Sequence, residues 1–304
     1  MNIQKFRAVV AHPVKYMRYY LLRYPSVMPD RMYIETLWEK KMDYPLNLDH
    51  PKTFNEKLQW LKLYDRNPKY TNLVDKQEVK KIVAELIGSE HVIPTIGIWN
   101  HVEDIRLEDL PDRFVLKTTH DSGSICICKD KKTFDFEEAK RKLSASLSFD
   151  YWLLGREWPY KNVERRIIAE PYLEDNETKE LRDYKFFCFN GEVKLMFIAT
   201  DRQNREEPYF DFFDMDFNHI DMRHGHPNAP TVPEKPAHFE KMAELACTIA
   251  GKMPQVRVDF YEVNGKVFFG EVTLFHHSGW MPFDPVEWDY TLGSWILLPK
   301  PYHG

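Results

Sequence analysis

Apolar residues repeat at helical spacing in the first third of the chain, whereas apolar and polar residues alternate in several later segments. A repeat of three and four residues predicts a helix with one buried face, and alternation predicts a strand. Thr53 is suited to cap a helix that begins at residue 54, and Glu56 lies in the first turn of that helix. The expected helices span 5–23, 30–42, 54–64, 75–86, 135–147 and 237–250.

The strands predicted from the alternating segments span 114–117, 125–128, 167–169, 184–189 and 193–200, and a hairpin follows at 256–275. Residues 93–97 indicate an extended edge. Residues 201–236 are rich in Asp, Asn, His and Pro and are predicted to be irregular, and the segment after the last hairpin is predicted to be mostly loop. Because helices come first and antiparallel hairpins dominate later, the expected fold class is α+β.

The hairpin at 256–275 is the most informative stretch, because each of its strands has a polar face. Asn264-Gly265 marks the turn. Successive side chains of a strand point to opposite faces, so Arg257 and Asp259 share one face. On the returning strand, the same alternation places Glu271 and Thr273 on one face and Phe268, Val272 and Leu274 on the other.

The length of the turn decides whether the two polar faces coincide. A two-residue turn would place Asp259 and Glu271 on opposite faces, whereas a three-residue turn that starts at Val263 brings them together. We expect the longer turn, with Gly265 left-handed, because it also unites the large apolar residues. Two carboxylates beside Arg257 then form a site for a hard cation and a phosphate. The alternative is that Arg257 only neutralises the two acids on a solvated face.

The loop between the predicted strands 114–117 and 125–128 is a second candidate site. Lys117 stands at a strand end, where it can reach an anionic ligand as a point charge. Small residues in the loop let backbone N–H groups approach phosphate oxygens, although an ordinary flexible hairpin loop has the same composition. These small residues are Thr118, Thr119, Ser122, Gly123 and Ser124.

Two further segments carry weaker signals. Residues 170–174 follow a predicted strand, and Pro171 stiffens them. Such a segment can offer backbone hydrogen bonds to an adenine edge and a carboxylate to ribose hydroxyls. Lys185 projects from the polar face of the hairpin 184–200, where a solvated lysine is the usual explanation.

Composition narrows the class of protein. The 304 residues include 42 basic and 47 acidic ones, and the net charge of −5 gives no general field that would attract nucleic acid. The four cysteines show no disulfide-rich spacing, which fits a reduced cytoplasmic setting. Cys126 and Cys128 share a face of one predicted strand, and we expect core thiols there rather than a metal pair.

No stretch of 18 apolar residues and no signal-peptide pattern occurs, so we expect a cytoplasmic protein without a transmembrane segment. Residues 5–42 mix basic and apolar side chains. We expect these residues to pack against the body of the protein or a partner. The alternative is an amphipathic helix that rests on the inner face of a membrane.

Five blocks of sequence, in this order, resemble the TupA-like branch of the ATP-grasp superfamily, which is named for teichuronopeptide biosynthesis. The resemblance covers about residues 51–300. The blocks are TFNEKLQWLKLYDRNPKYTNLVDKQEVKKIV, FVLKTTHDSGS, LGREWPYKNVERRIIAEPYLED, LRDYKFFCFNGEV and VRVDFYEVNGKVFFGEVT.

The resemblance implies two α+β subdomains that clasp ATP between antiparallel sheets, after a helical N-terminal region. The implied divisions are 1–71, 72–165 and 166–304. The ATP contacts implied are Lys76, Lys117, Ser122, Gly123, Ser124, Glu170, Tyr172, Leu173, Glu174 and Lys185. The implied magnesium ligands are Asp259, Glu271 and Thr273, and Arg257 would hold a phosphate or the intermediate.

The chain departs from the family pattern at the end of the implied site. Thr273 stands where many ATP-grasp enzymes have Asn, and His276-His277-Ser278-Gly279 stands where many continue into Pro-Gly. These departures leave the acceptor end of the site, and the roles of His276 and His277, open.

The activity implied is ATP-dependent ligation of a carboxylate to an amine through an acyl phosphate, with Lys117, Lys185 and Arg257 stabilising the transferred charge. The implied substrates are a uronic acid of a bacterial surface polysaccharide or capsule and an amino acid or other amine. One alternative is a glycosyltransferase of the same pathway that uses Asp211, Asp214 and Asp216, which we expect instead to be turn residues. Another is a non-catalytic ATP-binding assembly factor.

Overall fold

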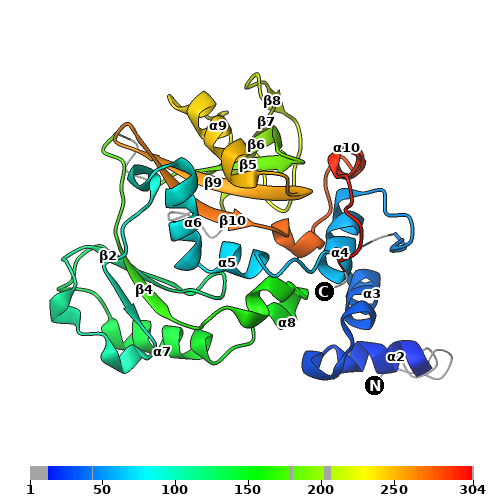
Figure 1. The fold of residues 1–304 in the computed structure, drawn as a ribbon, viewed down its shortest axis with the longest axis horizontal. Helices are drawn as coiled ribbons and strands as arrows, with labels where there is room; N and C mark the ends of the chain where they lie inside the picture. The colour runs from blue at the N-terminus through cyan, green and yellow to red at the C-terminus, as the bar shows by residue number, and fades with distance from the viewer. Residues whose placement is uncertain (1–12, 43, 178–180, 202–206, 303–304) are drawn as a thin grey trace.

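The computed structural model describes residues 13–42, 44–177, 181–201 and 207–302. Its strands form two sheets in which all neighbours are antiparallel, and helices precede, connect and cover them (Figure 1). The helices are α2 (Pro13–Leu21), α3 (Asp30–Lys41), α4 (Phe54–Tyr64), α5 (Tyr70–Val74), α6 (Glu78–Ile87), α7 (Phe136–Leu147), α8 (Trp152–Gly155), α9 (Phe239–Ala250) and α10 (Glu287–Trp295).

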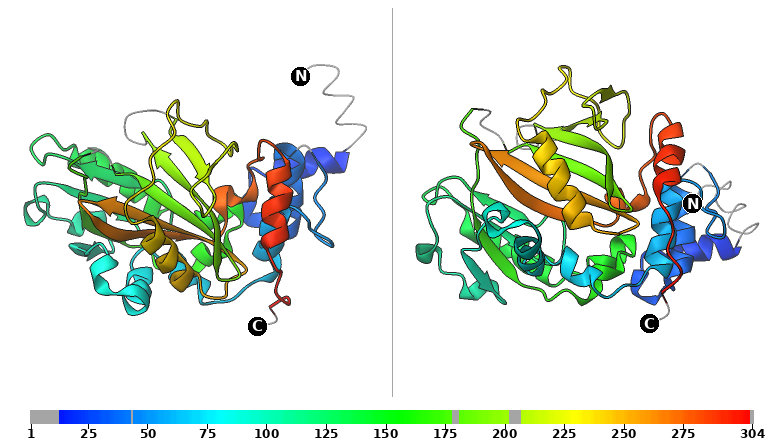
Figure 2. Two further views of the ribbon diagram at one scale, coloured as in Figure 1. Left: turned by 90° about the horizontal axis from the view of Figure 1, so that it is seen from above. Right: turned by 45° about the horizontal axis from the view of Figure 1, so that its top comes forward.

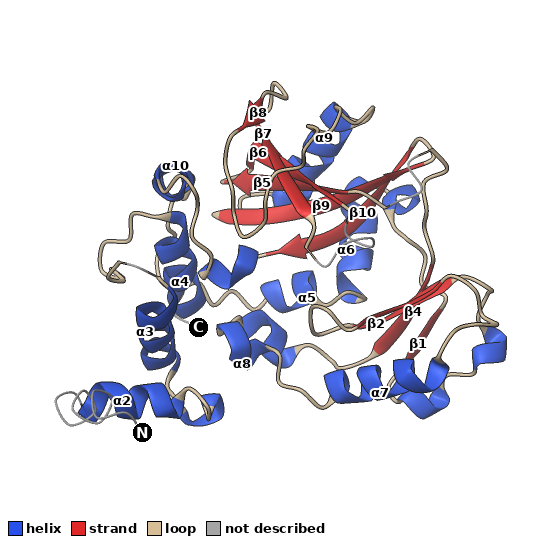
Figure 3. Ribbon diagram, turned by 180° about the vertical axis from the view of Figure 1, so that it is seen from behind, coloured by secondary structure: helices blue, strands red, loops and turns tan. Residues whose placement is uncertain are grey.

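The small sheet has the strand order β1-β4-β2-β3 and the large sheet the order β10-β9-β5-β6-β7-β8. Figure 1 shows the two sheets on opposite sides of α5 and α6, and Figure 3 shows the same arrangement from behind. The strands are β1 (Gly97–Trp99), β2 (Phe114–Thr118), β3 (Ile125–Cys128), β4 (Ile167–Pro171), β5 (Asp183–Phe189), β6 (Glu192–Thr200), β7 (Tyr209–Phe213), β8 (His219–Ile220), β9 (Gln255–Val263) and β10 (Lys266–Thr273).

Each sheet has its own apolar core. The small sheet packs against α7 around Phe114, Leu116 and Leu143. Cys126 and Cys128 are buried free thiols of this core, as expected from the sequence. The large sheet packs against α9, and α4 of the N-terminal region contributes apolar side chains to the same core. The N-terminal helices are therefore continuous with the body of the protein, which matters for the site described below.

Local signals predicted several helix boundaries correctly. The Thr53 hydroxyl accepts a hydrogen bond from the backbone N–H of Glu56, and the Glu56 carboxylate accepts one from the backbone N–H of Thr53, which fixes the start of α4. The helix expected at 75–86 begins three residues later, because the Asp75 carboxylate accepts hydrogen bonds from the backbone N–H groups of Gln77 and Glu78. Of the helix expected at 5–23, residues 13–21 are helical, and residues 5–12 lie outside the described residues.

Two expectations for the second half of the chain are wrong. β7 and β8 extend the large sheet within the segment predicted to be irregular, where β7 pairs with β6. The tail contains α10, which packs against α4. Asp289 of α10 accepts hydrogen bonds from the backbone and side chain of Asn55, at 2.9 and 3.0 Å. The partners of the short helix α10 lie more than 230 residues away in the sequence, so its local sequence pattern was too weak to predict it.

The β9–β10 hairpin has a two-residue turn, so the expected three-residue turn is wrong. Val263 pairs with Lys266, and Asn264 and Gly265 are both left-handed, with φ of 50° and 74°. This geometry is that of the short turns which match the twist of paired strands.

The polar residues of the two strands nevertheless share a face, because the register shifts by one residue between Phe269 and Glu271. Beyond this bulge Asp259 lies opposite Glu271. A Cβ atom at Gly270 would lie 3.2 Å from the carbonyl oxygen of Asp259, so glycine suits the close approach. Before the bulge Phe268 lies opposite Tyr261 on the polar face, which corrects the prediction that it joins Val272 and Leu274.

Candidate active site

A cavity of about 450 Å³ lies between the two sheets. Its walls come from α5, α6, the loop after β2, strands β5, β6, β9 and β10, and the turn that follows β10. Its charged and polar lining includes Lys76, Asp121, Ser122, Tyr151, Glu157, Tyr160, Lys185, His226, Arg257, Glu271, Thr273, His276, His277 and Ser278.

Arg257 is the centre of a charged cluster on the large sheet. Its Nε and Nη2 donate to the two carboxylate oxygens of Asp259, both at 2.7 Å, and Nη2 also donates to Glu271 at 2.8 Å. Lys185 lies opposite Asp259 in the register of β5 and β9 and contacts the same carboxylate. Arg257 therefore does neutralise both acids, and it does so in a wall of the cavity rather than on a solvated face.

Burial and charge set the ionisation of this cluster. Asp259 is fully buried, which by itself raises the pKa of its carboxyl, but Arg257 and Lys185 outweigh burial and lower that pKa to about 2. Burial lowers the pKa of Lys185, and Asp259 acts in the opposite direction. Asp259 is thus an anion over the whole physiological range.

Magnesium fits the donor set of this wall. Asp259 and Glu271 supply anionic oxygens from directly opposite positions, and the hydroxyl of Thr273 lies 3.4 Å from Glu271 Oε1. Glu271 lines the cavity, and 46 % of its side chain is exposed. Its Oε2 makes no hydrogen bond with the described residues. Arg257 and Lys185 occupy the lone pairs of Asp259, so a metal at this carboxylate has to replace one of those contacts.

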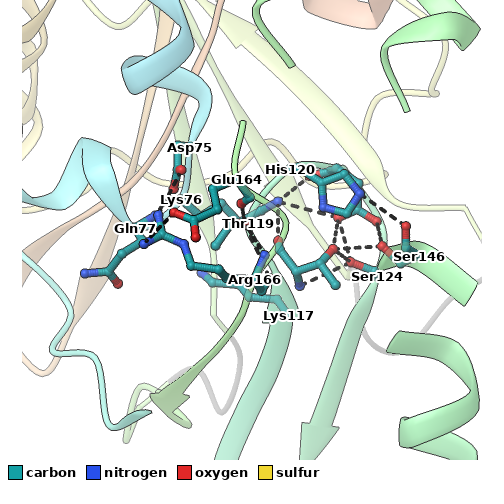
Figure 4. Close-up of polar contacts among 12 residues, drawn as sticks. Asp75, Lys76, Gln77, Lys117, Thr119, His120, Ser124, Ser146, Glu164 and Arg166 are labelled. Carbon is teal, nitrogen blue, oxygen red and sulfur yellow. Dashed lines mark hydrogen bonds and ion pairs between the residues drawn. The ribbon is translucent and has the colours of Figure 1, made fainter. Parts of the chain in front are cut away.

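Lys76 faces this cluster from the segment between α5 and α6. Its Nζ donates to the carbonyl oxygen of Thr118 at 2.9 Å and to that of Asp121, so it holds the loop after β2. Burial lowers the pKa of Lys76, and Asp121 opposes that shift. Figure 4 shows Lys76 beside this loop, next to Asp75 and Arg166, which form an ion pair at 3.1 Å.

The base of the loop after β2 is tied down by a buried network. Asp121 accepts hydrogen bonds from the hydroxyls of Thr118, Ser124 and Ser146, each at 2.6 Å. Ser124 and Ser146 lie side by side in Figure 4. Ser124 therefore points into the network, whereas Ser122 lines the cavity. Gly123 forms the exposed tip with a φ of 99° and no atom near its missing Cβ.

A second charged cluster lies on the small sheet. Glu170 is buried between Lys117 at 2.6 Å and Lys80 at 2.5 Å. Burial alone would raise the pKa of Glu170, but the two lysines outweigh it and the pKa lies below its ordinary value. Lys76 and Gly270 line the small pocket beside this cluster. Sequence reasoning missed Lys80, although it lies one helical turn after Lys76 in the same block of sequence.

The rest of the segment 170–174 is further from the cavity. Glu174 accepts a hydrogen bond from Arg113 at 2.8 Å and one from the Tyr172 hydroxyl at 3.3 Å. The guanidinium of Arg113 stacks over the ring of Tyr172, 4.5 Å from its centre. Tyr172, Leu173 and Glu174 do not line the main cavity.

A turn of histidines closes the other end of the cavity. His276 Nδ1 lies 2.6 Å from Arg257 Nη1, so the turn touches the charged cluster. One ring nitrogen each of His224, His276 and His277 lies within 4.8 Å of the other two. Burial, followed by Arg257, His226 and Lys185, lowers the pKa of His277 to about 4. Burial also takes the pKa of His224 and His276 well below the ordinary value, so the three rings are uncharged at neutral pH.

The three aspartates considered for a glycosyltransferase do not form a common site. Asp214 and Asp216 lie in the β7–β8 turn, where Asp214 accepts backbone hydrogen bonds from Asp216 and Asn218. Asp211 lies within β7 rather than in a turn, and its buried carboxylate bonds to His219 and the backbone of Ala229. These contacts give each aspartate a local structural role.

The fold, two antiparallel sheets around a cavity with helices before them, is the α+β arrangement of ATP-grasp ligases. A family model places the chain more narrowly: it belongs to the TupA-like ATPgrasp family, whose model matches residues 56–297. A comparison with curated proteins found no match.

Solved structures of ATP-grasp ligases resemble the chain distantly. The D-alanine–D-alanine ligase from Bacillus anthracis, complexed with ATP, is 15% identical over 66% of this chain and 53% of its own, with a TM-score of 0.38. The D-alanine–D-alanine ligase from Helicobacter pylori is 12% identical over 80% and 69%, with a TM-score of 0.43. The L-amino acid ligase from Bacillus licheniformis is 14% identical over 81% and 55%, with a TM-score of 0.43. This chain spans little more than half the length of the two Bacillus enzymes.

Proposed function

We propose that the protein is an ATP-dependent ligase that joins a carboxylate to an amine through an acyl phosphate. The observation that carries this proposal is a pair of charged clusters on opposite sheets, one lining the main cavity and the other lining the small pocket next to it; Lys76 and Gly270 line both spaces. Glu170 with its lysines lies on the small sheet, and Arg257 with Asp259 lies on the large one. Two neighbouring spaces lined by cations and carboxylates suit a nucleotide and its metal.

The proposed ATP-binding residues come from both sheets and from the loop after β2. Lys76, Ser122 and Lys185 line the cavity, and Lys76, Lys117 and Glu170 line the small pocket. The full proposed set is Lys76, Lys117, Ser122, Gly123, Ser124, Glu170, Tyr172, Leu173, Glu174 and Lys185. The corresponding subdomains are proposed to span 72–165 and 166–304, after a helical region at 1–71.

In the proposed reaction an oxygen of the substrate carboxylate takes the γ-phosphoryl group of ATP and releases ADP. The amine nitrogen then attacks the acyl carbon, the bond to the phosphate oxygen breaks, and an amide and phosphate result. Arg257, Lys185 and Lys117 stabilise the negative charge that moves between these groups. Asp259, Glu271 and Thr273 would hold magnesium, which supplies positive charge beside the phosphates.

We propose a hexuronic acid as the carboxylate substrate and an amino acid or another amine as its partner, within the synthesis of a bacterial surface polysaccharide. The family to which the chain belongs, together with its resemblance to teichuronopeptide biosynthesis, supports this choice. The cationic side chains Arg257 and Lys185 in the cavity wall suit an anionic sugar.

ADP release tests the proposed activity directly. Purified protein with Mg-ATP is screened against uronic acids and amines, and ADP is expected only when both substrates are present. UDP-sugars form the control arm. Turnover of a UDP-sugar without ATP would establish a glycosyltransferase instead. ATP binding without turnover of any pair would favour an assembly factor.

We also propose that α2 makes a peripheral membrane contact. No helix among the described residues is long and apolar enough to cross a membrane. α3 buries Ile34 and Trp38, as expected for a helix that packs on the body, but α2 buries no residue. Figures 1 and 2 show α2 at the edge of the molecule, and its Met17 and Tyr20 are 58 % and 54 % exposed.

Vesicle flotation tests the membrane proposal. Vesicles that contain phosphatidylglycerol should carry the protein with them, and substitution of Met17 and Tyr20 by serine should abolish this. Met32→Ser on α3 is the matched control, because Met32 is exposed on a helix that packs on the body. Self-association that the same α2 substitutions abolish would assign this face to a second copy of the chain.

A further inference from the structure

The turn after β10 has a backbone that side-chain-bearing residues rarely adopt. His277, Ser278 and Gly279 are three consecutive left-handed residues, with φ of 45°, 55° and 62°. For the two residues that are not glycine this conformation is unfavourable, and it persists only where the surroundings hold it in place. Strain of this kind is common at ligand sites. Residues of α4 hold this turn on one side, and the turn presents two histidines to the cavity on the other.

Helix α4 holds the turn from below. Lys62 is fully buried, and its Nζ donates to the carbonyl oxygen of Ser278 at 2.7 Å and to the hydroxyl of Ser278 at 3.1 Å. Gln59, one turn earlier, donates to the carbonyl oxygen of Gly279 at 2.8 Å. Burial lowers the pKa of Lys62 to about 7, and the buried carboxyl of Glu157 opposes this shift. A fully buried lysine side chain thus donates its hydrogen bonds to this one turn.

The turn presents His276 and His277 to the cavity, and hydrogen bonds fix the role of the first. His276 Nδ1 lies 2.6 Å from Arg257, whose guanidinium can only donate. Nδ1 therefore accepts, and Nε2 of the uncharged ring carries the hydrogen. A nitrogen that carries hydrogen offers no lone pair to a metal, so the convergence of His224, His276 and His277 is not a metal site.

His277 is the ring without a fixed role. It stacks on Phe210 with the ring planes at 27°, and its centre lies 6.0 Å from that of His226. Its buried Nε2 has no hydrogen-bond partner among the described residues, and the same holds for Nε2 of His276 and Nδ1 of His224 and His226. A buried polar atom without a partner in a cavity wall indicates a ligand group that would satisfy it.

The charges around His277 indicate which ligand fits. Arg257 and Lys185 both disfavour a proton on its ring, and they act in the same way on any cation placed beside it. Glu157 and Glu271 line the same cavity, but neither opposes the lowering of the His277 pKa; Glu207 lies 3.8 Å from His226, and its side chain is 58 % exposed. An ammonium is therefore disfavoured at this end of the cavity, whereas an uncharged amine can donate a hydrogen bond to an imidazole.

We propose that His277, with His226 and Phe210, binds the amine substrate in its uncharged form, and that Lys62 is the positioning residue for this wall. The inference rests on the proposed ligase function. The uncharged amine keeps the lone pair that forms the bond to the acyl carbon, the bond from that carbon to the phosphate oxygen breaks, and a proton from the nitrogen leaves with the phosphate. Recognition of the free base thus selects the nucleophilic form.

Binding of two small amines tests the inference without knowledge of the natural substrates. Protein labelled with ¹⁵N-histidine, saturated with magnesium and a non-hydrolysable ATP analogue, is titrated with hydroxylamine and with methylamine near neutral pH. The two amines match in size, but hydroxylamine is mostly uncharged there and methylamine is protonated. Hydroxylamine should shift the His277 ring signal saturably, and methylamine should not. Equal responses to both amines would overturn the proposed selectivity.

Variants of α4 test the positioning role. Lys62→Met should weaken hydroxylamine binding about tenfold, the loss of roughly one buried hydrogen bond, while nucleotide binding stays unchanged. Lys57→Met is the matched control, because Lys57 lies on the same helix but donates to Gly293 and Ile296, away from the turn. His277→Gln gives a second route if Lys62→Met fails to fold; with the neighbouring His226 ring signal as the readout, it should weaken hydroxylamine binding in the same way.

The outcomes separate this inference from the proposed function. Nucleotide binding with no saturable response of His277 to hydroxylamine would overturn the amine site and leave the ligase proposal standing. Failure of the ATP analogue to bind would overturn the ligase proposal itself. A Lys62→Met variant that folds and binds hydroxylamine normally would show that Lys62 only stabilises the fold.

Discussion

The two sheets each carry a buried carboxylate between two cations, but the two clusters have opposite excess charge. On the small sheet Glu170 is shared by Lys80 and Lys117, which leaves one positive charge in excess. All three groups lie within a few ångströms and are mostly shielded from water. A cluster with excess positive charge attracts an anion.

On the large sheet the acids are in excess. Arg257 and Lys185 face Asp259, Glu271 and Asp183, the last of which lies 3.3 Å from Lys185. These five groups leave one negative charge in excess, and the half-exposed carboxylate of Glu271 is where a cation is favoured. His277, at the other end of the cavity, is affected by Arg257 and Lys185 of this cluster and not by its acids. The comparison teaches that the main cavity and the small pocket next to it, which share Lys76 and Gly270, are lined by clusters suited to a cation and to an anion respectively, as a nucleotide with its metal requires.

The largest expected effect comes from removal of each shared carboxylate. Asp259→Asn leaves Arg257, which cannot lose its charge, with one strong partner fewer, and should lower the free energy of unfolding by about 3 kcal/mol or more. Glu170→Gln should cost less, because Lys80 can lose its proton: burial already lowers its pKa. Urea unfolding of both variants makes this comparison, and a larger loss for Glu170→Gln would reverse it.

Ligand titrations distinguish the cluster around Glu170 from the cluster around Asp259. Mg-ATP at about 100 times its dissociation constant should raise the free energy of unfolding by about 2.7 kcal/mol. Lys117→Met should weaken ATP binding with and without magnesium, whereas Glu271→Gln should weaken only the magnesium-dependent part. Calorimetric titration of the two variants measures this. If Lys117→Met and Glu271→Gln weaken the same component of ATP binding, the two clusters do not bind different parts of the ligand.

Acid should remove the contribution of Asp259. Its folded pKa of about 2 lies below the ordinary 3.8, so the ionised carboxylate stabilises the fold above pH 3.8 and this stabilisation is lost as pH falls towards 2. The contribution is about 2 kcal/mol. The difference in stability between the wild type and Asp259→Asn should therefore shrink across this window. A difference that stays constant would contradict the assigned ionisation.

The smallest expected effect concerns the bulge at Gly270, which places Glu271 opposite Asp259. Gly270→Ala places a Cβ atom 3.2 Å from the carbonyl oxygen of Asp259 and should cost about 1 kcal/mol. Because the bulge sets Glu271 opposite Asp259, magnesium-dependent binding should weaken as well. Gly123→Ala is the control on the other sheet: it has open space, and its φ of 99° costs about 1 kcal/mol without change in the carboxylates. Equal effects of both variants on metal dependence would leave the bulge without a role.

The sequence alone determined the fold class, most helices and strands, and the face that carries Arg257 and Asp259, because these depend on local periodicity and on short capping and turn motifs. Resemblance to a family added the candidate site. The prediction that Glu271 joins this face is confirmed, although for a different reason: the turn is short, and the bulge at Gly270 restores the alignment. Turn chemistry predicted a left-handed Gly265, but a bulge inside a strand has little local signal.

Only the tertiary structure decided which charges share a carboxylate and what the N-terminal helices do. Lys80 joins Glu170 from a separate helix, and Lys62 reaches Ser278 across 216 residues of sequence. α10 and β7 likewise exist because distant partners complete their hydrogen bonds and cover their apolar faces. Local patterns fix conformation over a few residues, whereas the cost of a buried charge is met only by groups that folding brings together. The architecture could therefore be predicted from the chain, and the electrostatic division of its cavity could not.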